Sequence, residues 1–236
     1  MSRVLASVLS AVVVCAASAS ARAADTPKDV LEKAITAHGG AELLAKNKAG
    51  LLKAKGKITL PGVGDVDFTQ EAAFMLPDKF KESVEITIMG KSISILTLAN
   101  GDAISIEAMG QKIEVSDAIK DAMKDATHMI TVGRLVGPAR EKGFELNLIG
   151  ESKVDDKPVV GVRVSAKGKK DISLFFDAKT NLLVKMEYRS SDPMTGNEFG
   201  EERVLKDYKK DNDGNMVPQK VTVIRDGKKF LDAEVT

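Results

Sequence analysis

The N-terminal part of the chain has its apolar residues at helical spacing. Thr26 and Pro27 are residue types that favour the start of a helix. The apolar positions that follow recur with a helical period: Val30, Leu31, Ala34, Ile35 and Ala37. Gly39-Gly40 then provides the left-handed residue that ends a helix, and "AELLAKNKAG" continues as a second short helix. We therefore interpret His38 as part of an elbow between two helices, where a protonated imidazole suits the helix dipole, and not as a catalytic or metal-binding residue.

From Leu51 onward the apolar residues alternate with polar ones, which is typical of strands with one wet face. In "FKESVEITI", the apolar positions Val84, Ile86 and Ile88 alternate with polar or charged residues. The segments "SISILTLA" and "DAISIEA" are separated by Asn100-Gly101, which is a strong hairpin signal. The pattern over residues 51–115 therefore predicts an antiparallel meander.

One helical pattern interrupts these strands. Ser116 is suited to cap a helix, and a stripe at spacings of four, three and four residues follows it: Ile119, Met123, Ala126 and Ile130. The pattern predicts an amphipathic helix from Asp117 to about Leu135, ended by Gly137-Pro138. Strand patterns then resume and continue to the last residue, interrupted by the polar loop "SDPMTGNEFGEE" and with a further turn signal at Asp226-Gly227.

No linker and no internal repeat divides the chain, so residues 24–236 are predicted to form a single domain of roughly a dozen strands. The predicted fold class is mostly β with a few helices (α+β). A single large curved antiparallel sheet would form an unclosed β-barrel. The N-terminal helices and the central helix would cover its open side.

Residues 1–23 have the pattern of a secretory signal peptide. Arg3 precedes a short apolar run, and Ala21-Arg22-Ala23 forms a cleavage signal. A lipid anchor on Cys15 is disfavoured because Val14 stands where a small residue is expected. We expect an exported, periplasmic protein without a membrane-spanning segment in its mature part. If Cys15 leaves with the signal peptide, disulfide bonds are excluded.

Charge and composition exclude other classes of partner. When Arg3 and Arg22 leave with the signal peptide, Lys+Arg falls from 35 to 33 against 34 Asp+Glu, so the mature chain is close to −1. This balance gives no support for nucleic-acid binding. Aromatic residues make up only 4%, with no Trp, which argues against sugar-stacking surfaces.

The sequence offers little catalytic or metal-binding chemistry. His38 and His128 are the two histidines and lie far apart. "KDNDGN" resembles part of a calcium-binding loop. A loop with Gly214 at its sixth position, however, needs acidic residues at its first and twelfth positions, where this chain has Lys209 and Lys220. A hairpin turn fits this segment better. No serine-nucleophile, Walker or dinucleotide motif is present, so no catalytic residue, metal ligand or cofactor is predicted.

A curved sheet with an apolar lining suits a hydrophobic ligand. The residues predicted to line its cavity lie on the strands and on the covering helix: Phe74, Phe80, Ile86, Ile88, Ile95, Leu98, Ile119, Met123 and Ile130. The alternative for each of them is ordinary core packing, in a cup filled by its own side chains.

Several segments together resemble the outer-membrane lipoprotein-sorting (LolA/LolB-like) superfamily. They are "AITAHGGAELLAKNKAGLLKAKGKITLPG", "LPDKFKES", "ANGD" and "KDYKKDNDGNMVPQKV", and the similarity extends over most of the mature chain. It implies an unclosed antiparallel barrel with helices at its mouth, carrying lipid or acyl chains through the periplasm. No ligand-contacting residue is carried over from it.

The sequence thus favours a periplasmic, non-enzymatic carrier for a hydrophobic ligand, either a lipid or a lipoprotein's acyl chains, with an envelope donor or acceptor protein as a possible partner. Two alternatives stay open. One is a structural or interaction module of the cell envelope with a filled β core and no ligand. The other is an enzyme, which nothing in the sequence favours.

Overall fold

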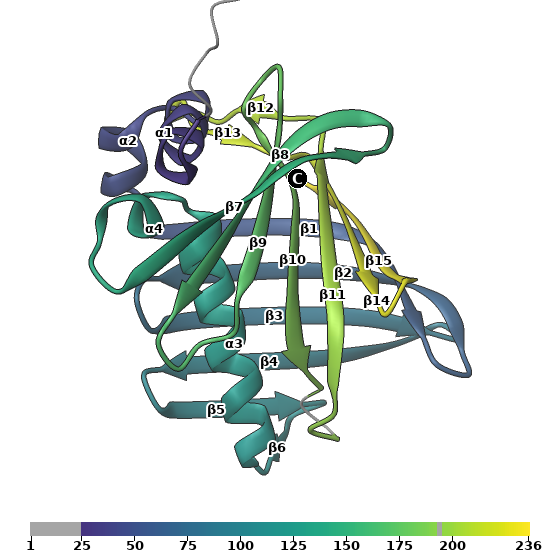
Figure 1. The fold of residues 1–236 in the computed structure, drawn as a ribbon. Helices are drawn as coiled ribbons and strands as arrows, with labels where there is room; N and C mark the ends of the chain where they lie inside the picture. Colours follow the sequence, from purple (N-terminus) through teal and green to yellow (C-terminus); the bar gives the residue numbers. More distant parts are fainter. Residues whose placement is uncertain (1–24, 193–194) are drawn as a thin grey trace, which may run out of the picture.

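In the computed structural model, residues 25–192 and 195–236 form one large antiparallel sheet with four helices in this part of the chain (Figure 1). The predicted signal peptide, with Cys15, lies outside the described residues. Thirteen strands pair in the order β6-β5-β4-β3-β2-β1-β15-β14-β11-β10-β9-β8-β7, and the end strands β6 and β7 do not pair with each other. The predicted fold class, an unclosed antiparallel barrel, is confirmed.

The sheet has two halves joined by the C-terminal strands. The first half consists of β1 (Ala49–Leu60), β2 (Gly64–Met75), β3 (Lys79–Ile88), β4 (Lys91–Asn100), β5 (Ala103–Ala108) and β6 (Gln111–Ile113). The second half consists of β7 (Phe144–Val154), β8 (Lys157–Ala166), β9 (Ile172–Asp177), β10 (Leu183–Ser191) and β11 (Glu198–Lys206). The joining strands are β14 (Lys220–Arg225) and β15 (Lys228–Val235). A small separate hairpin is formed by β12 (Lys209–Lys210) and β13 (Met216–Val217).

The helix elbow near the N-terminus is confirmed. Helix α1 (Pro27–Ala37) begins with a capping box between Thr26 and Asp29. Gly39 and Gly40 have φ values of 122° and 92°, and helix α2 (Ala41–Lys46) follows at once. Both φ values lie in the region that glycine adopts at little cost, which is why the first helix ends here.

The central helix α3 (Asp117–Gly133) begins at the predicted residue but ends earlier than expected. Leu135 takes a left-handed φ of 69° and is only 1% exposed, because its side chain enters the core. This reversal starts the short helix α4 (Val136–Arg140). Gly137-Pro138 therefore lies within α4 and does not end the central helix.

The hairpin signals correspond to turns of the sheet. Asn100-Gly101 joins β4 to β5, with a φ of 60° at Gly101. Asp226-Gly227 joins β14 to β15, and both of its residues have positive φ, as the tightest hairpin turns require. The segment that resembled a calcium loop is the turn between β12 and β13, in which the Asp211 carboxylate accepts hydrogen bonds from the backbone N–H groups of Asp213 and Asn215.

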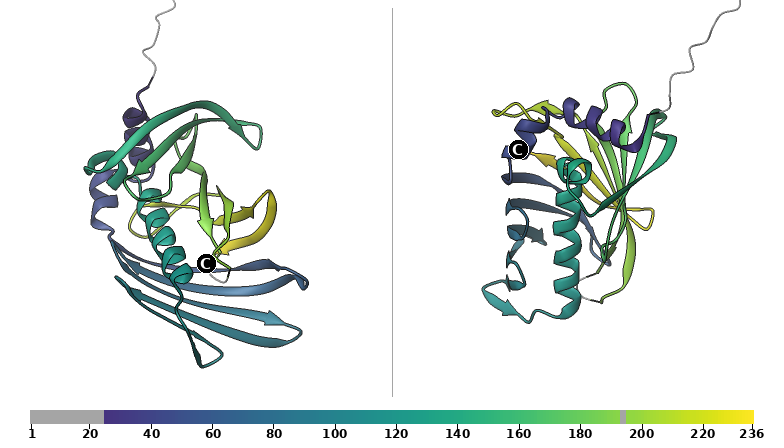
Figure 2. Two further views of the ribbon diagram at one scale, coloured as in Figure 1. Left: turned by 60° about the horizontal axis from the view of Figure 1, so that its bottom comes forward. Right: turned by 60° about the vertical axis from the view of Figure 1, so that its left-hand side comes forward.

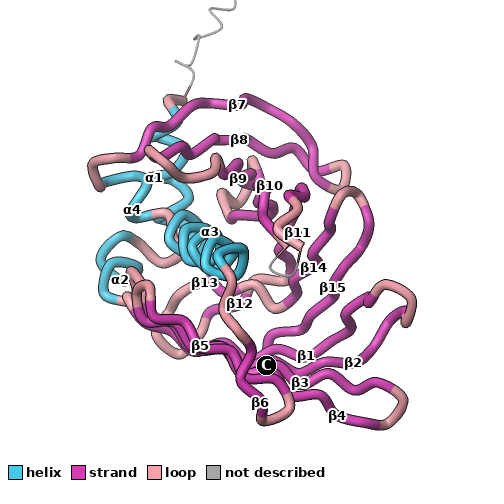
Figure 3. The backbone as a smooth tube through the Cα atoms, turned by 90° about the horizontal axis from the view of Figure 1, so that it is seen from below, coloured by secondary structure: helices cyan, strands magenta, loops and turns pink. Residues whose placement is uncertain are grey.

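The main core lies between the helices and the second half of the sheet. It contains Leu31 and Ile35 from α1, Val132 from α3, and buried side chains of β8, β9 and β10. The helices pack mainly on β7 to β10. Figure 2 shows α3 standing between the two halves, and the view from below in Figure 3 shows it in the opening between β5 and the strands β9 and β10. The helix thus covers the open side while resting on the second half.

Candidate ligand-binding site

The first half of the sheet has one mainly apolar face, which looks toward α3 and also carries the hydrogen-bonded pair Gln70 and Glu82. We call it the inner face. Its side chains form a second cluster, in which one group is buried and another is half-buried. The buried group is Ala54, Val66, Phe68, Ile86 and Ala233, and the half-buried group is Ile58, Leu60, Val84, Ile88, Ile95 and Leu231. The outer face carries mainly polar and charged residues, as the alternation of a strand requires.

Five of the predicted lining residues share the inner face. Phe74 and Phe80 are direct partners across β2 and β3, and Ile95 pairs with Val84 across β3 and β4. Ile86 and Ile88 extend the same row along β3. The structure therefore brings Phe74, Phe80, Ile86, Ile88 and Ile95 together on one surface.

Leu98 does not join them. It pairs with Lys81 and lies on the outer face, where it is 41% exposed. Ile95 and Leu98 are three residues apart, and positions separated by an odd number along a strand point to opposite faces. The prediction that Leu98 lines the same cavity is therefore wrong.

The helix residues lie on α3, which stands opposite the inner face. Ile119 is 7% exposed and Ile130 is half-buried. Met123 lines a cleft of about 430 Å³, shared with Ala99 and Ile104 of the strands. Polar side chains of α3 line the rest of its helical wall: Lys120, Lys124, Thr127, His128 and Thr131. The cleft therefore has an apolar floor and a polar rim.

Sequence reasoning missed other members of the inner face. Val66, Phe68 and Ile58 occupy it, together with Leu231 from the last strand. The alternation within β1 and β2 was a sufficient signal for the first three. For Leu231 the signal was absent, because its place depends on pairing with Ile58, which is far away in sequence.

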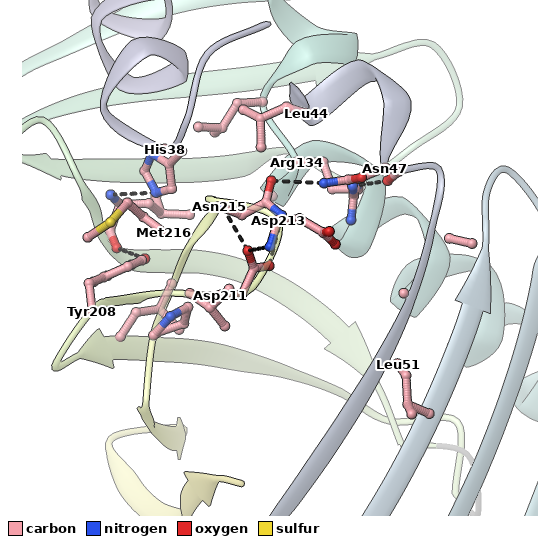
Figure 4. Close-up of a pocket in the computed structure, with 18 of the residues that line it drawn as sticks. His38, Leu44, Asn47, Leu51, Arg134, Tyr208, Asp211, Asp213, Asn215 and Met216 are labelled. Carbon is pink, nitrogen blue, oxygen red and sulfur yellow. Dashed lines mark hydrogen bonds between the residues drawn. The ribbon is translucent and has the colours of Figure 1, made fainter. Parts of the chain in front are cut away.

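A pocket of about 420 Å³ lies at the opposite end of α3, between the N-terminal helices and the β12–β13 hairpin (Figure 4). His38 forms part of its wall and is 8% exposed. Its Nδ1 lies 2.8 Å from the Ala34 carbonyl oxygen, and its Nε2 accepts a hydrogen bond from the Leu183 backbone N–H at 3.4 Å. Burial lowers the pKa of His38, although the Ala34 contact opposes this. The imidazole is therefore neutral, with both nitrogens engaged.

Arg134 reaches into the same pocket from the C-terminal end of α3. Its guanidinium donates to the backbone carbonyl of Asn47 and lies 5.3 Å from the centre of the Phe74 ring. Burial lowers the pKa of this side chain. Since Asn47 directly follows α2 and Phe74 lies on β2, the arginine ties the helix end to the first half of the sheet.

The pocket and the inner face offer binding surfaces without an evident reaction centre. Both His38 nitrogens have backbone partners, so the imidazole is not free to move a proton. Among residues 25–192 and 195–236, no three His, Cys, Asp or Glu side chains are grouped to hold a metal ion. The inner face offers apolar surface that is only half-buried.

Comparison with known proteins reveals similarity of fold at low sequence identity. No family model matches the sequence, and no curated protein matches it. A putative outer membrane lipoprotein-sorting protein domain from Vibrio parahaemolyticus has 8% identity and a TM-score of 0.51, covering 89% of each chain. A LolA superfamily protein from Nitrosomonas europaea has 11% identity and a TM-score of 0.50, covering 90% of this chain and 92% of that one. A DUF1329 family protein from Desulfovibrio piger has 13% identity and a TM-score of 0.55, with the same coverage. The predicted resemblance to the LolA-like fold is confirmed.

Proposed function

We propose that this protein is an exported, non-enzymatic carrier that binds a lipid, or the acyl chains of a lipoprotein, against the inner face of the first half-sheet. The observation that carries this proposal is the incomplete burial of the apolar side chains on that face. Six of its apolar side chains are only half-buried, while the helices pack mainly on β7 to β10. A ligand seated between α3 and β1 to β5 would remove this surface from water.

The free energy available from such burial is substantial. Each Å² of apolar surface removed from water contributes roughly 25 cal/mol before the costs of association. The Met123 cleft of about 430 Å³ falls in the size range of small-molecule sites. Its polar rim would orient a ligand whose chain lies on the apolar floor.

The similar structures support apolar cargo. The Vibrio protein is described as a lipoprotein-sorting domain, and its fold over most of both chains is the fold described above. Export is supported by the pattern of residues 1–23, and a donor or acceptor protein in the envelope would then deliver or receive the cargo. None of the helices in the described ranges is long and apolar enough to cross a membrane.

A titration with the uncharged probe N-phenylnaphthylamine tests the proposal, using two neighbouring substitutions on β3. Ile88→Asp places a charge on the inner face, whereas Thr87→Asp places the same charge on the exposed outer face. We expect micromolar binding by the wild type, at least a tenfold loss in Ile88→Asp and no change in Thr87→Asp. Circular dichroism checks that both variants are folded.

Absence of probe binding by the wild type would contradict the carrier proposal and favour the alternative, an envelope module with a filled core. Equal weakening by both substitutions would place the probe elsewhere than the inner face. Native mass spectrometry of the protein isolated from its cells, followed by lipid extraction, would then identify the natural cargo.

A further inference from the structure

A group of charged side chains lies on the inward-facing side of β10, β11 and β14. Glu201 is 3% exposed, although it is ionisable. It receives hydrogen bonds from Arg203 Nε to Oε1 at 2.9 Å, from Arg225 Nε to Oε2 at 2.9 Å, and from the Tyr188 hydroxyl. Arg203 Nε also donates to the Tyr188 oxygen at 2.8 Å. We call these four residues the arginine cluster.

The side of the sheet that carries the cluster follows from strand alternation. Met186 belongs to the main core under α3, and Tyr188, two residues further along β10, points the same way and packs against that core. Tyr188 pairs with Glu201, and Glu201 pairs with Arg225. The cluster is therefore inside the curve of the sheet, where charged side chains are costly unless they are paired or serve a ligand.

The cluster carries one positive charge in excess. Burial raises the pKa of Tyr188, which stays neutral. Burial alone would raise the pKa of Glu201, but Arg203, the Tyr188 hydroxyl and Arg225 lower it, so this side chain is ionised. Two guanidinium groups therefore share one carboxylate.

The excess charge is accessible. The side chains of Arg203 and Arg225 are 33% and 35% exposed. Both donate from Nε to Glu201, and the described residues supply no hydrogen-bond acceptor to their Nη groups. A guanidinium presents several donors in a planar fork suited to carboxylate or phosphate.

The arginine cluster adjoins the apolar inner face directly. Arg203 pairs with Val223, Val223 with Leu231, Leu231 with Ile58, and Ile58 with Val66. These residues form one row across neighbouring strands, about 4.8 Å apart from strand to strand. Arg225 is further flanked by the Phe199 and Phe230 rings, at 4.6 and 3.5 Å from their centres. A cation thus stands at the edge of a continuous apolar surface.

We propose that the arginine cluster binds the anionic head of an amphiphile, a carboxylate or a phosphate, whose hydrocarbon chain lies along the inner face. The inference rests on the proposed function and adds the chemical class of the ligand. The Nη groups of Arg203 and Arg225 would donate to the head, while Glu201 and Tyr188 hold the two guanidinium groups in place.

The first test uses the wild type alone. Dodecanoate, dodecanol and dodecyltrimethylammonium share a chain length and differ in head charge. Each is titrated as a competitor of N-phenylnaphthylamine at pH 7.5, below the micellar concentration of the two ionic compounds and below the solubility limit of dodecanol. We expect dodecanoate to bind at least tenfold more tightly than dodecanol, and the cation to bind most weakly. Millimolar inorganic phosphate should leave dodecanoate binding almost unchanged, whereas displacement by phosphate alone would indicate a site for a free anion and overturn the proposal.

The second test removes each cation in turn. Arg225→Gln and Arg203→Gln should weaken dodecanoate about tenfold and leave dodecanol within twofold. Arg189→Gln is the matched control, because Arg189 lies on β10 with its side chain 62% exposed and points to the outer side. It should change neither affinity. If Arg203→Gln fails to fold, Arg225→Gln and the wild-type order still decide the question.

The two proposals fail in different ways. If the wild type binds no N-phenylnaphthylamine, the carrier function is wrong. If it binds the probe but shows no preference for dodecanoate, or if the arginine variants lose both ligands equally, the carrier function stands and the anionic head is wrong.

Discussion

The guanidinium of Arg134 lies over the ring of Phe74, 5.3 Å from its centre, and joins the end of α3 to the half of the sheet on which the helix does not mainly rest. Together with the hydrogen bond to the Asn47 carbonyl, this contact fixes the distance between helix and inner face. Charged hydrogen bonds of this kind contribute roughly 1.5–3 kcal/mol.

Arg134→Ala is therefore expected to lower the free energy of unfolding by about 2 kcal/mol and to speed amide exchange in residues 47–52 and 129–135. Hydrogen exchange with mass spectrometry measures this. The control is Arg140→Ala, whose ion pair with Glu32 is exposed and contributes little. Equal exchange in both variants would show that Arg134 does not hold the helix.

Gly56 on β1 lies against the backbone of β15. A Cβ atom at this position would come within 1.9 Å of the Asp232 carbonyl oxygen and 2.9 Å of the Ala233 Cα. Since backbone cannot move aside cheaply, Gly56→Ala should destabilise the protein by about 3 kcal/mol, at the upper end of overpacking effects. Urea denaturation measures it.

Gly200→Ala is the matched control for this substitution. Gly200 is also a strand glycine, and a Cβ there would lie 3.6 Å from Asp226 Oδ1, an ordinary contact. It should change stability by less than about 0.5 kcal/mol. A tolerated Gly56→Ala would mean that β1 and β15 are not paired as described.

Burial of His38 makes stability depend on pH. Its pKa in the folded protein lies below the ordinary value of 6.5, so between these two values the unfolded chain binds more protons than the folded one. The free energy of unfolding should therefore fall as the pH is lowered from 7.5 to 5.5, by at most about 1.4 kcal/mol per pH unit for this group.

His38→Ala should reduce that pH dependence, as measured by denaturation at both pH values. It should leave the affinity for N-phenylnaphthylamine unchanged. His128, whose pKa is also lowered by burial and by Lys169, contributes in the same direction, so part of the slope should persist. A variant with unchanged pH dependence would show that His38 is not buried and neutral. Loss of ligand binding at unchanged stability would instead assign His38 a role in the site.

Met123 and Leu98 are both apolar, but only Met123 lines the cleft beside α3. Met123→Asp should weaken binding of N-phenylnaphthylamine at least fivefold, because it places a charge against the apolar floor. Leu98→Asp changes an exposed side chain of the outer face and should leave binding unchanged. The reverse order of effects would place the ligand on the outer face.

Local signals in the sequence were sufficient for most of the strands and their turns, but not for α4 or for the start of β11 at Glu198, within the predicted loop "SDPMTGNEFGEE". Gly39-Gly40 ends α1, and Asn100-Gly101 turns β4 into β5, because glycine relieves the backbone strain at positive φ. The end of α3 was less predictable, since the left-handed Leu135 is held by tertiary packing. No pattern of the neighbouring residues signals such a reversal.

The site was predictable only where alternation was unambiguous. In "SISILTLA", apolar residues stand at both odd and even positions, so the sequence did not show that Ile95 and Leu98 face opposite ways. The charges of "EERVLK" are typical of a solvated strand. Glu201 is inside the sheet because it pairs with Tyr188 and Arg225, and Arg203 is inside because it pairs with Met186 and Val223. These pairings are long-range relationships.

Photo-crosslinking with a diazirine-bearing hexadecanoic acid tests the central claim most directly. The carrier account predicts that peptide mass spectrometry finds the label on inner-face residues of β2 to β4, such as Phe68, Ile86 and Ile95, and on α3 near Met123. Excess unlabelled hexadecanoate should abolish this labelling. Labelling that excess ligand does not reduce, or labelling confined to outer-face residues such as Leu98, would contradict the claim that the inner face binds an apolar ligand.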